Sequence, residues 1–388
     1  MHVRQFLRVT LAPCRSRASG ESLPRDPRLA FLSELRMKLN LSLRASLLLS
    51  VISLPLTAAE VAPKPVGQTA PKKPATPATA PARPATPAKK TAAPLPPLPA
   101  PTQANVPYGE HERQVLDFYR AKSDKPTPLL FFIHGGGWVN GDKARPGSLV
   151  QCLNAGISVV SINYRLNTQA QQAGIKPPVQ WPLKDAARAL QFVRSKAKEW
   201  NIDKERIAAS GGSAGACSSL WLAFHPDMAD PQSSDPIARE STRLWCAAVN
   251  GAQTTLDPRQ MKEWTPNSRY GGHAFGFMPD PKDPKTRDTQ FAAFLAARDE
   301  LLPEINKYSP YAHVSADDPP IYLFYSAPPA LGQDQKDPTH TSNFGVKLQE
   351  RLREVGVPCE LVYPGAPDVK HAQTHEYLVD KLKAPSAK

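Results

Sequence analysis

One serine stands at the centre of a glycine-rich segment. Residues 206–220 read RIAASGGSAGACSSL, with Ser213 between Gly211 and Gly215. The run before it predicts a strand and the run after it a helix, and a sharply turned serine between them needs small neighbours to avoid collisions. The free N–H groups at the helix start would face whatever binds beside Ser213. The pattern is typical of a nucleophilic serine, and the alternative is a glycine-rich turn that contains a serine by chance.

A second glycine motif strengthens the nucleophile reading. Residues 133–138, IHGGGW, follow a strong strand pattern about 80 residues before Ser213. Three successive glycines let the backbone approach a substrate and turn N–H groups toward it, as a developing oxyanion requires, and each such donor can lower the barrier by about 3 kcal/mol. A phosphate-binding loop is the alternative, but no Gly-Lys-Ser/Thr signature supports it. Together the motifs indicate acyl transfer through an activated serine.

The elements that must position these motifs alternate along residues 104–388. Short β-branched and aromatic runs predict strands at 128–134, 156–164, 206–210, 244–252, 320–326 and 359–365. Helical spacing predicts helices at 182–200, 341–356 and 374–383. Such alternation predicts an α/β fold with a mostly parallel central sheet and helices on both faces. Residues 225–315 break the rhythm and predict an inserted lid or pocket wall.

These segments, with SINYRL, PLKDAARALQFVRSKAKEWNIDKERIAASGGSAGA and LQERLREVGVPCELVYPG, resemble the α/β-hydrolase superfamily. More narrowly, they resemble the hormone-sensitive-lipase-like and bacterial feruloyl-esterase-like (BD-FAE) carboxylesterases, over about 105–385 apart from the insertion. The resemblance implies a serine esterase whose oxyanion donors are the backbone N–H groups of Gly136, Gly137 and Ala214. It implies no metal and no organic cofactor, and it gives Asp185 and Arg188 a structural role.

The acid of a serine triad should follow the strand at 320–326, because this fold carries its triad in the order serine, acid, histidine. A family pattern aligns without gaps on residues 337–348, DPTHTSNFGVKL, and selects Asp337. The preceding loop is longer than usual and contains Asp334 as a rival. Asp317 and Asp318 are disfavoured because they precede the strand.

The base should follow the last strand, where the chain offers His371 and His375. We favour His371, because it lies closer to the strand end and before the final helix begins. His375 falls inside that helix and is interpreted as a surface residue. His340 is interpreted as a loop residue, and His134 as one that shapes the oxyanion turn through its own hydrogen bonds.

The substrate pocket has candidates beside the HGGG turn and in the insertion, and core packing is the alternative for each: Trp138, Trp264, Tyr270 and His273. The family resemblance, together with the export that residues 37–60 predict through a signal-peptide pattern, favours a small-molecule or carbohydrate ester, such as an acyl or feruloyl ester. A serine exopeptidase of the same fold is the first rival, and it would need an acidic pair to hold a substrate amine, which Glu240 and Glu263 do not evidently form. A non-catalytic binding protein that kept the fold is the second.

Charge is concentrated at the N-terminus. The formal net charge is +13, but residues 1–103 hold 15 Lys and Arg against 4 Asp and Glu, and the remaining 33 against 31 are nearly balanced. A nucleic-acid-binding domain carries its own basic face. The folded part therefore predicts no nucleic-acid partner.

The N-terminal part predicts export. Residues 37–60, MKLNLSLRASLLLSVISLPLTAAE, have a basic start, an apolar run and small residues, as a signal peptide cleaved near Ala59 would. The run is too short to anchor the protein in a membrane. Met37 is interpreted as the true start, and the alternative is that residues 1–36 are a translated extension; residues 1–59 hold this extension and the signal peptide. The Pro-, Ala- and Lys-rich residues 60–103 predict a disordered linker before the hydrolase domain at 104–388.

Cysteine usage indicates neither a zinc site nor a redox motif. The five residues are scattered, without a Cys-x-x-Cys pair or a Cys/His cluster. We interpret the four in the hydrolase domain chiefly as small buried side chains, with a single disulfide after export as the alternative.

Overall fold

The computed structural model describes residues 97–283 and 285–385. The predicted extension and signal peptide at 1–59, with Met37 and Ala59, lie outside the described residues, as does the predicted linker up to residue 96. The last residue of the predicted linker, Gln103, opens the first strand.

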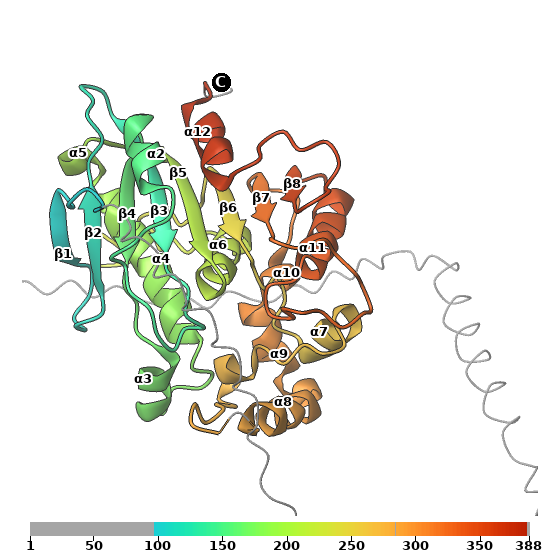
Figure 1. The fold of residues 1–388 in the computed structure, drawn as a ribbon. Coiled ribbons are helices and arrows are strands. Elements are labelled where there is room, and N and C mark those ends of the chain that lie inside the picture. The colour runs from blue at the N-terminus through green and yellow to red at the C-terminus, as the bar shows by residue number, and fades with distance from the viewer. Residues whose placement is uncertain (1–96, 284, 386–388) are drawn as a thin grey trace, which may run out of the picture. The chain divides into compact units, whose positions relative to one another are not determined.

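The described residues fold around an eight-stranded sheet in the order β1-β2-β4-β3-β5-β6-β7-β8 (Figure 1). All pairs from β4 onward in that order are parallel, whereas β1–β2 and β2–β4 are antiparallel. The sheet is therefore mostly parallel, as predicted. The strands are β1 Gln103–Pro107, β2 Val115–Tyr119, β3 Thr127–Ile133, β4 Ser158–Ile162, β5 Ile202–Gly212, β6 Cys246–Asn250, β7 Ile321–Phe324 and β8 Cys359–Val362.

Two of these strands were not predicted. Strand β1 is largely exposed at the sheet edge and lacks an apolar run, so its sequence carries little strand signal. Strand β2 is mostly buried, but it is short and follows a charged stretch. Strand β2 takes its place by pairing with β4, and β1 by pairing with β2.

Helices cover both faces of the sheet, and the pleat divides the core between them. Leu129, Phe131 and Ile133 of β3 pack into one cluster, while Leu130 faces the other. Alternate residues of a strand point to opposite faces, so both faces are apolar. The helices are α2 Leu149–Asn154, α3 Asn167–Gln172, α4 Gln180–Ser195, α5 Ala197–Trp200, α6 Ala214–Phe224, α11 Asn343–Glu354 and α12 Thr374–Lys383, together with those of the insertion.

The first cluster contains residues of α4, α6 and α11, and the second those of α2 and α12. Four cysteines of the described chain are unpaired, and three of them are buried: Cys152, Cys217 and Cys246, with Cys359 partly exposed. Among residues 97–283 and 285–385, no helix combines the length and apolar character that crossing a membrane demands.

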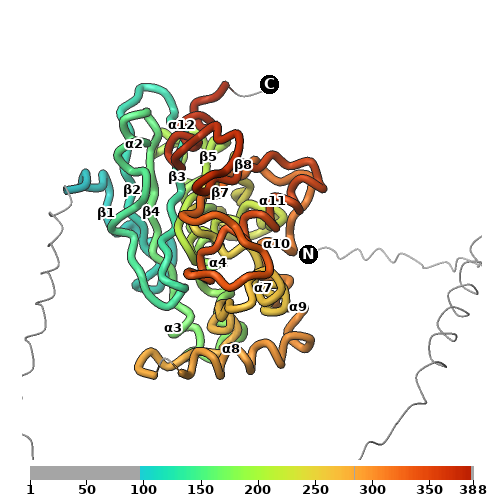
Figure 2. The backbone as a smooth tube through the Cα atoms, turned by 45° about the vertical axis from the view of Figure 1, so that its right-hand side comes forward, coloured from blue at the N-terminus to red at the C-terminus, as the bar shows by residue number. Residues whose placement is uncertain are grey.

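The insertion lies between β6 and β7, so it begins after residue 250 and not at the predicted residue 225. The prediction of 225–315 included β6 itself, whereas residues 225–245 link α6 to β6. The inserted helices are α7 Pro258–Trp264, the 3₁₀ helix η1 Gly272–Phe275, α8 Thr286–Ala296, α9 Arg298–Tyr308 and α10 Pro310–His313. Helices α7, α8 and α9 gather beyond the carboxyl ends of the parallel strands (Figures 1 and 2). An insertion at this edge can wall a site built on the strand ends.

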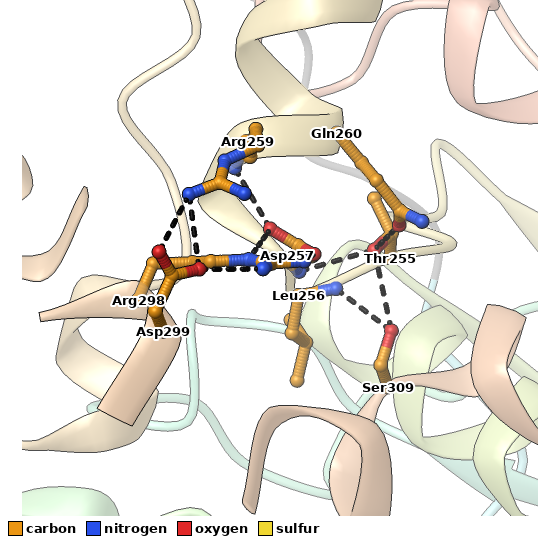
Figure 3. Close-up of polar contacts among 8 residues, drawn as sticks. All are labelled: Thr255, Leu256, Asp257, Arg259, Gln260, Arg298, Asp299 and Ser309. Atoms are coloured by element: carbon orange, nitrogen blue, oxygen red, sulfur yellow. Dashed lines mark hydrogen bonds and ion pairs between the residues drawn. The ribbon is translucent and has the colours of Figure 1, made fainter. Parts of the chain in front are cut away.

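A polar network joins the first residues of the insertion to its helices α7 and α9 (Figure 3). Asp257 accepts the backbone N–H of Arg259 at the start of α7 and pairs with Arg298 of α9, with Nη2 to Oδ2 at 2.6 Å. Ser309, at the end of α9, accepts the backbone N–H of Leu256 at 3.0 Å. The Asp257 and Arg298 side chains are only 6% and 15% exposed, so this pair is well desolvated. The network therefore holds α7 and α9 in one arrangement.

Candidate active site

Ser213 occupies the turn between β5 and α6. Its backbone has φ 54° and ψ −124°, which is strained for a residue with a side chain. The Ser213 N–H donates to the carbonyl of Asn250 at the end of β6, at 3.0 Å. This is the sharp strand-to-helix turn expected from the Gly-x-Ser-x-Gly pattern, and it presents the hydroxyl beyond the strand ends.

The two flanking glycines are required by close backbone contacts. A Cβ at Gly211 would come within 2.5 Å of the Ile133 carbonyl oxygen and 2.6 Å of the Gly215 carbonyl carbon. A Cβ at Gly215 would overlap the Ile133 carbonyl and lie 2.6 Å from that of His134. Because these neighbours are backbone atoms, they cannot rotate away. The glycines thus let the serine turn pack directly against the loop that follows β3.

The imidazole that meets Ser213 belongs to His340. Its Nε2 lies 2.9 Å from Ser213 Oγ, and its Nδ1 lies 2.8 Å from Asp337 Oδ2. An ionised carboxylate only accepts hydrogen bonds, so Nδ1 carries the proton and donates to Asp337. The neutral ring then accepts the hydroxyl proton of Ser213 at Nε2. Ser213, His340 and Asp337 form one continuous hydrogen-bonded chain, which is the geometry of a serine triad.

The prediction of His371 as the partner of Ser213 is wrong. His371 is buried, its Nδ1 pairs with Glu360 Oε2 at 2.8 Å, and its Nε2 faces Asp380 Oδ2 at 3.4 Å. It therefore joins the first half of β8 to α12. The rival His375 lies within α12, as the sequence indicated.

Sequence reasoning chose the loop after β8 because relatives usually carry their histidine there, but this chain places the imidazole three residues after the acid. The signal available was the Asp-x-x-His spacing of residues 337–340, together with the absence of a compact Gly-His after β8. Order along the chain could not show that the β7 loop folds back over β6.

Two contacts hold His340 over the end of β6. Gly251 has a φ of 57°, and a Cβ there would lie 3.3 Å from His340 Cβ and 3.4 Å from its Cδ2. The buried amide of Gln253 donates to the carbonyl of Thr339 at 2.7 Å. The glycine gives the imidazole room to lie against the backbone, and the amide fixes the residue before it.

The carboxylate that completes the hydrogen-bonded triad belongs to Asp337, as the sequence predicted. Its Oδ1 accepts the backbone N–H groups of Thr339 and His340 at 3.2 and 3.3 Å. Burial raises the pKa of Asp337, but the hydrogen bonds from His340 and from those two N–H groups outweigh it, so the pKa lies below its ordinary value. Asp337 is therefore ionised at neutral pH. The rival Asp334 is exposed and forms no side-chain hydrogen bond with the described residues.

The HGGG loop lies beside the serine turn. Gly136 and Gly137 have φ of 98° and 61°, and a Cβ at Gly135 would be 3.5 Å from Ser213 Cβ. Ala214 is the first residue of α6, so its N–H has no partner within the helix. The three predicted oxyanion donors, Gly136, Gly137 and Ala214, thus come from the two segments that meet around Ser213.

His134 supports this loop from beneath. It is 5% exposed, its Nδ1 donates to the Gly135 carbonyl at 2.7 Å, and its ring stacks on Tyr164 with centroids 4.2 Å apart. Burial, with the charge of Arg113, lowers the pKa of His134 to about 4. The ring is therefore neutral at neutral pH and shapes the turn as predicted.

Two cavities share Ser213 and His340. The larger has a volume of about 660 Å³ and is walled mainly by the insertion; the smaller, about 530 Å³, lies over the ends of the strands. Volumes of this size suit small-molecule ligands. Two chambers that meet at one serine can hold the acyl and alcohol halves of an ester. The larger is lined by Gly137, Val139, Asn140, Thr168, Ser213, Arg269, Tyr270, Gly272, His273, Phe277, Met278, Pro279, Pro281, Arg287, Gln290, Phe291, Thr339 and His340.

The four predicted pocket residues divide into two pairs. Tyr270 and His273 line the larger cavity. Trp138 is fully buried and donates its indole N–H to Ser218 Oγ at 2.9 Å, and Trp264 packs edge-on against Tyr311. The two tryptophans therefore support the fold, which was the alternative reading for each. Within residues 97–283 and 285–385, no group of three or more His, Cys, Asp or Glu side chains is placed to hold a metal ion.

Comparison with known proteins places the chain in a family. The BD-FAE family model matches residues 116–339, which is more than half of the chain. The chain belongs to the BD-FAE family. The matched range ends one residue before His340, so the family match includes Ser213 and Asp337 but not the imidazole between them.

Curated relatives of this chain are named as esterases. It is 31% identical to "Esterase LipQ" of Mycobacterium tuberculosis over 279 residues, covering 69% of this chain and 56% of LipQ. It is 27% identical to "Probable carboxylic ester hydrolase LipM" of the same organism over 280 residues, covering 69% and 55%. It is 30% identical to "Gut esterase 1" of Caenorhabditis elegans over 154 residues, covering 38% and 27%. The chain thus spans from about a quarter to just over half of the length of these relatives.

Solved structures share the fold. An acetyl ester-xyloside bifunctional hydrolase from Caldicellulosiruptor lactoaceticus matches with a TM-score of 0.50 and 23% identity, over 68% of this chain and 86% of that one. A truncated carbohydrate esterase from gut microbiota matches with a TM-score of 0.52 and 19% identity, over 73% and 96%. At these identities the likeness concerns the fold alone, an α/β-hydrolase.

Proposed function

We propose that the protein is a serine carboxylic ester hydrolase that works through an acyl-enzyme. The observation that carries the proposal is the hydrogen-bonded chain Ser213–His340–Asp337 at the junction of two cavities, beside the HGGG loop. Membership of the BD-FAE family and the names of the relatives support it.

The first half of the reaction forms the acyl-enzyme. Ser213 Oγ attacks the ester carbonyl carbon while His340 Nε2 takes the hydroxyl proton, and the carbonyl electron pair moves onto the oxygen. The N–H groups of Gly136, Gly137 and Ala214 stabilise that oxyanion, each by about 3 kcal/mol. As the oxyanion collapses, His340 returns the proton to the leaving alkoxide and an alcohol departs.

The second half releases the acid. Water attacks the acyl carbon and gives one proton to His340 Nε2, and the bond to Ser213 Oγ breaks as that proton returns to the serine. Asp337 keeps Nδ1–H oriented and stabilises the imidazolium in both halves without itself taking the proton. No other co-reactant is needed.

Carbohydrate esters are the substrate class that we propose within this chemistry, acylated or feruloylated on the sugar. The larger cavity offers both aromatic faces, from Phe277 and Phe291, and polar groups, from Asn140 and Gln290, which suits a sugar ring carrying an acyl group. One neighbour that shares the fold is named a carbohydrate esterase, which points the same way.

The exopeptidase alternative finds no support in the cavities. No Asp or Glu lines either of the two cavities that share Ser213, among the described residues, so no carboxylate is placed to hold a substrate amine. This favours an ester over an N-terminal peptide.

A burst assay tests the proposal. With p-nitrophenyl acetate, we expect a burst of p-nitrophenol equal to the enzyme concentration, and mass spectrometry of the quenched protein should place one acetyl group on Ser213. Ser213→Ala should show neither. Faster cleavage of an aminoacyl-p-nitroanilide than of the acetate ester would overturn the assignment, as would an acetyl group on another residue.

A further inference from the structure

Two residues that line the larger cavity carry buried polar atoms without a hydrogen-bond partner. Tyr270 is 6% exposed, yet its hydroxyl has no hydrogen-bond partner among the described residues. The Nε2 of His273 also lacks a partner of ordinary geometry there, although the ring interacts with the Gly137 backbone. Both residues line the cavity together with Ser213. Buried polar groups are nearly always paired, so two that share one wall call for an explanation. A polar group of a ligand that displaces the side chains covering these atoms would satisfy them.

A cation stands on the same wall. Arg287 of α8 is exposed and lines the cavity, so it lies where the cavity meets solvent. It forms no ion pair among the described residues; its guanidinium makes only long hydrogen bonds, to Thr339 Oγ1 at 3.4 Å and to the Arg269 carbonyl at 3.5 Å. The neighbouring Arg269 is already paired, with Asp288 Oδ1 at 2.8 Å. No acidic side chain among the described residues lines this cavity, so Arg287 faces it uncompensated.

The titration of the two buried groups agrees with an anionic ligand. Burial raises the pKa of Tyr270 well above its ordinary value, so the phenol keeps its proton and can donate. Burial also lowers the pKa of His273 to about 4, so the ring adds no positive charge of its own at neutral pH. Any recognition of charge in this cavity therefore falls to Arg287.

We propose that the larger cavity selects esters that carry a carboxylate, which pairs with Arg287 and accepts a hydrogen bond from Tyr270. This inference rests on the proposed esterase function and narrows its substrate class to anionic esters, such as half-esters of dicarboxylic acids or acyl esters of carboxylated alcohols. Guanidinium and carboxylate pair well, through two parallel N–H···O bonds.

The smaller cavity is the weaker candidate for this role. It also contains an arginine, Arg145, which forms no ion pair among the described residues. However, no buried unpartnered polar atom of the described chain belongs to a residue that lines it. Only the larger of these two cavities is therefore lined by residues with buried, unpartnered polar atoms, among the described residues.

Matched neutral and anionic esters test the proposal. Monoethyl glutarate and its primary-amide analogue differ only in a carboxylate on the acyl half, and 4-acetoxybenzoate and 4-acetoxybenzamide differ only in one on the alcohol half. At low salt we expect kcat/KM for at least one carboxylate to exceed that of its amide by about tenfold. The pair that shows the preference identifies the half of the ester held in the larger cavity. High salt should reduce the preference, because Arg287 is exposed.

Variants assign the preference to a residue. Arg287→Gln should bring the carboxylate-to-amide ratio close to one, Arg287→Lys should keep most of it, and Tyr270→Phe should lower it. Arg269→Gln, a matched arginine of the same cavity, should keep it. Because the readout is a ratio, a general loss of activity from disturbing Thr339 would not change it.

Two results would overturn the inference. One is a ratio near one for both substrate pairs in the unmodified protein; the other is loss of the preference in Arg145→Gln instead of Arg287→Gln. In either case, hydrolysis of the ester bond in the two neutral, amide-bearing analogues, with acylation of Ser213, would still support the esterase function. Failure of all four esters together with p-nitrophenyl acetate would instead refute the esterase function and the inference that rests on it.

Discussion

Replacing Gly251 by alanine should slow the reaction by displacing His340. The glycine has a φ of 57°, which an L-residue adopts at a cost of about 1 kcal/mol. The added Cβ would sit 3.3 Å from His340 Cβ and 3.4 Å from its Cδ2, so the imidazole must move by a few tenths of an ångström. Misplacing a catalytic group by 1 Å can cost about a hundredfold, so a shift of this size predicts a fall in kcat of about fivefold to tenfold.

Gly332→Ala is the matched control. Gly332 has a φ of 70°, and nothing lies within 4 Å of the position that its Cβ would occupy. Both variants should lose about 1 kcal/mol of unfolding free energy in urea titrations, from the same backbone conformation. Only Gly251→Ala should lose kcat on p-nitrophenyl acetate. Equal kcat in the two variants would refute the claim that packing on Gly251 positions the imidazole.

Three further predictions concern stability, each measured as the free energy of unfolding in urea. Gly215→Ala should lose about 3 kcal/mol or more, because its Cβ would overlap backbone carbonyls, whereas Gly212→Ala, whose nearest neighbour is 3.9 Å away, should lose far less. Burial lowers the pKa of His134 to about 4, so as pH falls below about 6.5 the unfolded chain takes up this proton before the folded protein does. The stability that the neutral ring contributes is therefore complete above that pH, and about 2 kcal/mol of it should be lost by pH 5. His134→Gln should abolish this loss. Arg298→Ala leaves Asp257 buried and unpaired and should cost about 3 kcal/mol; a change below 0.5 kcal/mol would show that the pair does not hold the insertion.

The parts of the fold with strong local signals could be predicted from sequence. Buried strands such as β3 and β4 are apolar on both faces, and α12 begins and ends where its helical pattern does. Ser213 could also be predicted from sequence, because the glycines that permit its turn lie next to it in the chain. The edge strand β1 carries no comparable pattern, since it is held by pairing rather than by its own burial.

The base could not be found in the same way. Its position depends on contacts between segments far apart in sequence, Gly251 and Gln253 on one side and Thr339 and His340 on the other. A rule of order along the chain placed the histidine after β8, where His371 instead meets Glu360. Long-range packing selected between two imidazoles that local sequence could not distinguish.

The mechanism depends on His340 as the base that takes the proton of Ser213. Its most direct test is kcat/KM for p-nitrophenyl acetate in His340→Gln and His371→Gln, at a temperature where circular dichroism shows both variants folded. We predict a loss of about a thousandfold or more in His340→Gln and less than about threefold in His371→Gln. Near-normal activity in His340→Gln, with an inactive His371→Gln, would show that His340 is not the base.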